Sequence, residues 1–122
     1  MRILIVEDEA IVAMHLAMLV VELGHEVCAT VASAADAVAR AVALRPDVVL
    51  MDIRLAGGSS GVDAARELHT RQALRCIFLS ANLDESTRTA LLPCDPIDFI
   101  GKPVLPILLQ RALQKAEGLT ER

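Results

Sequence analysis

The 122-residue sequence is poor in aromatic residues: it contains two phenylalanines and no tyrosine or tryptophan, so aromatics make up 2% of the chain. Since 54% of the residues are nevertheless hydrophobic, the core has to be built from aliphatic side chains and methionine, which suits helices packed on a sheet. A chain of this length fits one domain that needs no disulfide or metal to fold. We therefore expect a single domain over residues 1–122.

The cysteines lack the spacing of a metal site or a disulfide framework. Cys28, Cys76 and Cys94 form no CxxC pair, and none has a histidine at metal-ligand spacing. We interpret them as buried thiols in a reducing compartment.

Long hydrophobic runs and excess positive charge are also missing. No segment approaches the roughly 18 consecutive apolar residues of a membrane span, and the apolar start of the chain is too short for a signal peptide. The net charge of −4 argues against a surface that binds nucleic acid by general electrostatic attraction. We expect a cytoplasmic protein with neither a membrane nor a nucleic-acid partner.

Short apolar runs alternate with helical patterns along the whole chain. The predicted strands are 2–6, 25–30, 48–52, 76–79 and 97–100, and the predicted helices are 9–23, 33–45, one opening at Ser60, 84–91 and 103–115. Five successive βα units predict an α/β fold, a doubly wound parallel sheet with right-handed crossovers and helices on both faces. Met14, Met18 and Met51 are expected in the core, and Ile107 and Leu108 are expected among the residues that the last helix can bury.

Polar residues collect where the predicted strands end. Asp52 directly follows the apolar run 48–51, and Glu7, Asp8, Ser80 and Lys102 follow or end three other strands. Ligands of open α/β sheets bind at this carboxyl edge. Three clustered carboxylates repel one another unless a cation intervenes, and their oxygens suit Mg²⁺. The cluster predicts a divalent metal.

Four short motifs resemble the signatures of one family, the response-regulator receiver domain of two-component signalling. They are Val6-Glu7-Asp8-Glu9, Met51-Asp52, Leu79-Ser80-Ala81 and Gly101-Lys102-Pro103, in the right order, and the resemblance covers essentially the whole chain. It implies a flavodoxin-like, five-stranded sheet of order 2-1-3-4-5. Only four residues follow Gly118, so we expect no output domain in this chain.

The resemblance also assigns roles at the phosphorylation site. It implies that Asp52 is the phosphorylated aspartate, that the Ser80 hydroxyl hydrogen-bonds the phosphoryl group, and that Lys102 pairs with it. A carboxylate is a competent nucleophile toward phosphorus when the surrounding negative charge is neutralised. We expect a phosphoacceptor that promotes its own phosphorylation and dephosphorylation, and not an enzyme with a separate substrate.

The metal ligands follow from the same resemblance. It implies that Asp8 is the main metal-binding acid, that Glu7 reaches the metal through water, and that Arg54 supplies a backbone carbonyl beside Asp52. The expected cofactor is Mg²⁺.

The implied partners are a histidine kinase or a histidine phosphotransfer protein as donor, and a downstream protein or a second copy of the chain as receiver of the signal. Ser80 and Phe99 are the expected switch residues. Drawing Ser80 inward would vacate space for Phe99 and alter the surface of the 84–91 helix, the 97–100 strand and the 103–115 helix.

Some features depart from the family pattern. The segment after Asp52 contains Gly57-Gly58 where a proline and an Asp-Gly pair are more usual, and we expect it to be flexible. Val104 stands where a phenylalanine is frequent, which leaves the phosphorylation residues intact.

Other interpretations remain open at this point. Taken singly, Asp52 or Asp8 could be a turn or helix-capping residue, and Lys102 a solvated lysine. A haloacid-dehalogenase-like phosphatase also uses an aspartyl phosphate, but it needs an aspartate where Arg54 stands. A flavodoxin-like binding module that does not depend on phosphorylation would need a phosphate loop after the first strand, where the acids at 7–9 would repel the phosphate.

Overall fold

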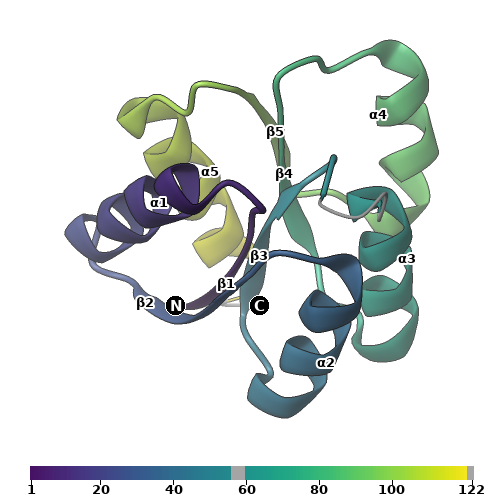
Figure 1. Ribbon diagram of the computed structural model, residues 1–122, viewed down its shortest axis with the longest axis horizontal. Coiled ribbons are helices and arrows are strands. Elements are labelled where there is room, and N and C mark those ends of the chain that lie inside the picture. The colour runs from purple at the N-terminus through teal and green to yellow at the C-terminus, as the bar shows by residue number, and fades with distance from the viewer. Residues whose placement is uncertain (56–59, 121–122) are drawn as a thin grey trace.

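Five strands and five α-helices alternate in the computed structural model, which describes residues 1–55 and 60–120 (Figure 1). The strands are β1 (Arg2–Val6), β2 (Glu26–Val31), β3 (Val48–Asp52), β4 (Cys76–Ser80) and β5 (Asp98–Gly101). The helices are α1 (Ala10–Glu22), α2 (Ala34–Leu44), α3 (Gly61–Gln72), α4 (Glu85–Leu91) and α5 (Pro106–Thr120), and a short 3₁₀ turn, η2 (Leu92–Cys94), follows α4. All strand pairs are parallel in the order β2-β1-β3-β4-β5, which confirms the predicted fold class.

The helices cover the two faces of the sheet as separate layers. Helices α1 and α5 lie on one face, and α2, α3 and α4 lie on the other (Figure 1). Successive side chains of a strand point to opposite faces, so the central strands, buried on both sides, contribute to both cores. Alternate residues of β1, β3 and β4 accordingly belong to two different core clusters. One cluster contains Ile3, Ile5, Val48, Leu50, Ile77 and Leu79, and the other contains Leu4, Val6, Val49, Met51, Cys76 and Phe78.

The predicted ends of the elements hold within a few residues. Gly24 has φ +90°, a conformation that glycine adopts without strain, and it follows α1 as expected. The prediction of a last helix over 103–115 is wrong at both ends, because α5 runs from Pro106 to Thr120, and proline suits a first helical position. Leu109 and Leu113 of α5 are buried, but Ile107 and Leu108 are 50% and 37% exposed, which corrects their expected burial.

The methionines divide between core and surface. Met51 is fully buried, as predicted, whereas Met14 and Met18 are 67% and 59% exposed, so the prediction for these two is wrong. The reason lies in α1, whose thirteen residues are apolar on every side apart from His15 and Glu22. Only one side of the helix packs on the sheet, and the sequence pattern does not distinguish it from the other.

All three cysteines are free thiols, and Cys76 and Cys94 are buried as expected. Burial raises the pKa of the Cys76 thiol well above its usual range. Cys28 is only half-buried, and its sulfur donates a hydrogen bond to the Ile3 carbonyl at 3.3 Å.

Among the described residues, none of the helices has the length and apolar character needed to cross a membrane. The predicted flexible Gly57-Gly58 segment lies outside the described residues.

Candidate functional site

The candidate site forms where four neighbouring strands end. Asp52 and Ser80 are the last residues of β3 and β4, Glu7 and Asp8 follow β1, and Lys102 follows β5. Because these strands are adjacent and parallel in the order β1-β3-β4-β5, their carboxyl ends meet at one edge of the sheet. The structure therefore brings together the five residues that the sequence places at strand ends.

Strand alternation explains which side chains touch. Glu7, Asp52 and Lys102 continue the rows of strand residues that face α1 and α5, so the three charged groups converge on one side of the edge. The Lys102 ammonium lies 2.8 Å from Glu7 Oε2 and 3.0 Å from Asp52 Oδ2. In this structure the lysine bridges the two carboxylates.

The bridge is largely removed from water. The side chains of Glu7, Asp52 and Lys102 are 0%, 7% and 18% exposed. Burial, together with the neighbouring Asp52 carboxylate, raises the pKa of Glu7, although Lys102 opposes the shift. Burial disfavours the charge on Lys102, but its hydrogen bonds to Glu7 and Asp52 outweigh that effect, and the pKa of Lys102 is raised.

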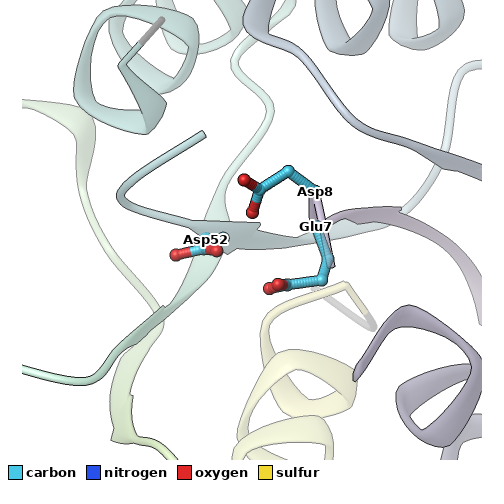
Figure 2. A group of neighbouring side chains, drawn as sticks. All are labelled: Glu7, Asp8 and Asp52. Carbon is cyan, nitrogen blue, oxygen red and sulfur yellow. The ribbon is translucent and has the colours of Figure 1, made fainter. Parts of the chain in front are cut away.

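Glu7, Asp8 and Asp52 form an acidic cluster that could hold a metal ion. One carboxylate oxygen from each lies within 4.8 Å of the others. Figure 2 shows Glu7 and Asp8, consecutive at the end of β1, turning their carboxylates toward the side on which Asp52 lies. Asp8 is exposed while the other two are buried, so the cluster opens to solvent at Asp8. An oxygen-only donor set of this kind suits a hard cation such as Mg²⁺.

A cavity of about 270 Å³ gives access to Asp52. Its lining includes Asp8, Asp52, Arg54, Ser80 and Lys102. The Arg54 backbone N–H donates to Asp52 Oδ1 at 3.2 Å, and the Ser80 hydroxyl accepts from the Asn82 backbone N–H at 3.1 Å. Glu7 does not line the cavity, since its side chain lies fully buried and held by Lys102.

Comparison with known proteins identifies the family. The family profile described as "Response regulator receiver domain" matches residues 3–114. The chain belongs to the response regulator receiver domain family. Such receivers are phosphoacceptor modules of two-component signalling, so a regulatory role is supported at the level of the family.

Individual relatives agree with this assignment. The chain is 38% identical over 116 residues to the phyllosphere-induced regulator PhyR of Methylorubrum extorquens, covering 94% of this chain and 43% of the relative. It is 31% identical to the chemotaxis protein CheY of Thermotoga maritima, covering 93% and 95%. The crystal structure of the response regulator PhyR from Brucella abortus superposes with a TM-score of 0.84 at 33% identity, covering 98% of this chain and 49% of that one. The chain spans less than half the length of the first three curated relatives that it matches.

Gly61 supports the receiver site, and the sequence analysis did not identify it. It opens α3 directly beside the end of β3, with its N–H donating to the Ile53 carbonyl at 2.9 Å. A Cβ atom at this position would lie 2.1 Å from the Asp52 carbonyl oxygen. Only glycine lets the helix approach the nucleophile's backbone this closely. The signal in the sequence that could have identified it is a glycine directly after Ser60, the N-cap residue of α3.

A second group missed by the sequence analysis surrounds Phe99. The rings of Phe99 and Phe78 stack with centroids 5.6 Å apart, and the Arg88 guanidinium carbon lies 5.0 Å from the Phe99 centroid. Phe99 is half-buried, on the face of the sheet that carries α4. The expected switch aromatic thus lies between a core residue and a residue of α4.

Proposed function

We propose that this receiver accepts a phosphoryl group on Asp52 from a phosphohistidine of a histidine kinase or histidine phosphotransfer protein, with Mg²⁺ as cofactor. The observation that carries the proposal is the placement of Asp52. Its carboxylate is buried, paired with Lys102 at 3.0 Å, adjacent to two further acids, and open to a cavity large enough for a phosphoryl group.

Asp8 and Asp52 would hold the metal directly, Glu7 would reach it through water, and the Arg54 backbone carbonyl would complete the protein ligands. The bound ion would neutralise the acids and the phosphoryl oxygens. Receiver chemistry of this type consists mainly of positioning and electrostatic stabilisation. The chain's own contribution is an aspartate already oriented by the Arg54 N–H and a lysine already beside it.

In the transfer step an Asp52 carboxylate oxygen attacks the phosphorus, the new P–O bond forms, and the P–N bond to the histidine breaks, so that the imidazole leaves. After transfer, the Lys102 ammonium would bind a phosphoryl oxygen in place of part of its contact with Asp52. Its ion pair with Glu7 would keep the lysine at the site. The Ser80 hydroxyl, at the rim of the same cavity, would donate to another phosphoryl oxygen. Arg54 in place of an acid/base aspartate disfavours the phosphatase alternative.

We further propose that the signal leaves through the surface of α4, β5 and α5, toward a downstream protein or a second copy of the chain. Ser80 and Phe78 are two residues apart on β4, hence on the same face, and Phe78 pairs with Phe99 of β5. A displacement of Ser80 therefore acts on the ring pair that borders α4. This contact supports Ser80 and Phe99 as the switch residues.

Phosphorylation is tested by incubating the protein with acetyl phosphate and Mg²⁺ and measuring the intact mass. One phosphoryl group per chain is expected, with none after EDTA treatment and none in Asp52→Asn. Labelling that survives the substitution or the chelator would contradict the assignment.

The output surface is tested by NMR with and without beryllofluoride and Mg²⁺. Shift changes are expected at Phe99 and along residues 84–91. Changes confined to the segments around Asp8, Asp52 and Lys102 would exclude the proposed switch.

A further inference from the structure

Phe99 is held from both sides. Phe78, fully buried on β4, stacks on one side with an interplanar angle of 24°, and the guanidinium of Arg88 lies over the ring from α4. An arginine in this position attracts the ring electrostatically and also packs against it. The Arg88 contact thus joins α4 to β5 through the expected switch residue.

Helix α4 contributes few of its own side chains to the core. The helix has seven residues, and Leu91, at its last position, is the one buried residue among them. The carboxylate of its N-cap residue, Asp84, accepts hydrogen bonds from the Thr87 N–H at 2.7 Å and from the Ser86 hydroxyl at 3.3 Å. These polar contacts join residues of the helix to its own cap. Arg88, one turn before Leu91, reaches from the exposed side of α4 across to Phe99 of β5.

The ring pair lies directly next to the phosphorylation site along the strands. Phe78 is in register with Phe99, and Ser80 is in register with Gly101, two residues further toward the carboxyl edge. An adjustment of Ser80 would therefore act on the neighbouring Phe78–Phe99 pair, whose outer side Arg88 covers. The contact therefore lies between the site and α4.

We propose that Arg88 is a positioning residue that restrains the receiver in its unphosphorylated arrangement by holding Phe99 and α4 together. This inference rests on the proposed function and adds a regulator of the same site. A contact that stabilises only the unphosphorylated arrangement lowers the population that is ready to accept phosphate. Removing it enlarges that population, and with it the rate at which Asp52 is phosphorylated.

The test compares Arg88→Gln, Arg88→Lys and a control, Arg40→Gln, which changes an exposed arginine on α2. Gln, Lys and Arg have similar helix propensities, so the substitutions leave the intrinsic stability of the helix nearly unchanged. The first measurement is the initial rate of Asp52 labelling by acetyl phosphate with Mg²⁺. The second is backbone hydrogen exchange of residues 85–94 in the unphosphorylated protein.

Arg88→Gln should raise the labelling rate about two- to fivefold and should accelerate exchange in 85–94 by a similar factor, as expected for loss of an exposed cation–π contact. Arg88→Lys keeps the charge without the planar stacking and should fall between Gln and the parent. Arg40→Gln should match the parent in both measurements.

Two results would overturn the inference while leaving the proposed function intact. One is a labelling rate that is unchanged or lower in Arg88→Gln, even if exchange is faster, since Arg88 would then only support α4. The other is unchanged exchange in 85–94. Absence of Asp52 labelling in the parent protein would instead overturn both proposals.

Discussion

Asp52 and Gly61 depend on each other through backbone packing. The carbonyl of Asp52 occupies the space that a side chain at 61 would need, so the start of α3 and the end of β3 lock the position of the nucleophile. The charged groups of the site could be predicted from the sequence, because they end apolar strands and strand ends converge. Gly61 could not, because its importance lies in an interatomic distance between two elements.

Gly61→Ala is expected to destabilise the protein by about 1–3 kcal/mol, the usual cost of overpacking a tight contact, and to slow Asp52 labelling because the backbone of Asp52 must move. Urea unfolding and acetyl phosphate labelling measure the two effects. Gly118→Ala is the matched control, since a Cβ at this α5 position would meet nothing within 4 Å. Alanine should be neutral there or stabilising by up to about 1 kcal/mol. Equal effects at 61 and 118 would contradict the packing argument.

His25 gives the stability a pH dependence of its own. Its side chain is 8% exposed, with Nδ1 3.0 Å from the amino terminus and Nε2 3.1 Å from Glu117. Burial, followed by the positive amino terminus, lowers the pKa of His25 from its usual 6.5, while Glu117 opposes the shift.

A histidine with a lowered pKa in the folded state favours folding in its neutral form. The contribution is present above the unfolded-state pKa of about 6.5 and is lost as the pH falls through that value toward the folded-state pKa. We expect the unfolding free energy to decrease between about pH 7 and pH 5, and to decrease less steeply in His25→Gln. Urea unfolding at a series of pH values checks this, and an unchanged slope in the variant would contradict it.

Among the elements, α1 shows most clearly where sequence patterns stop being informative. Helix α3 has a polar outer side, and its N-cap Ser60 accepts hydrogen bonds from the first turn, in agreement with the predicted helix start at Ser60. Ser33 caps α2 in the same way. Helix α1 has no comparable contrast between its sides, so the burial of Met14 and Met18 was predicted wrongly. The central strands β1, β3 and β4 were predictable because both of their faces are buried, which makes nearly every residue of each run apolar.

The division of the methionines predicts that the same substitution costs much more stability at one position than at the other. Met51→Ala removes a fully buried side chain and should cost about 2–5 kcal/mol of unfolding free energy. Met14→Ala changes a 67% exposed side chain and should stay within about 0.5 kcal/mol of the parent. Thermal or urea unfolding of the two variants distinguishes these values. A large loss of stability in Met14→Ala would show that the outer side of α1 is covered in the folded protein.

At the scale of the whole molecule, five βα units predict the parallel sheet, and the resemblance to receivers predicts the strand order that is observed. The arrangement concentrates chemistry at one edge because each of four neighbouring strands either ends in a polar residue or is followed directly by one. The sequence did not show that Lys102 bridges Glu7 and Asp52, or that Arg88 covers Phe99. The Lys102 contacts join elements far apart in the chain, and the Arg88 contact joins α4 to the strand that follows it. Both follow from side-chain geometry that periodicity does not encode.

The most direct test of the account is the position of the phosphoryl group. The protein is treated with acetyl phosphate and Mg²⁺ and then with borohydride, which converts an aspartyl phosphate to homoserine, and the peptides are sequenced by mass spectrometry. We predict homoserine at position 52 alone, and none when EDTA is present during phosphorylation. Homoserine at Asp8 or at another aspartate, or an unmodified Asp52 in a fully folded sample, would contradict the central claim.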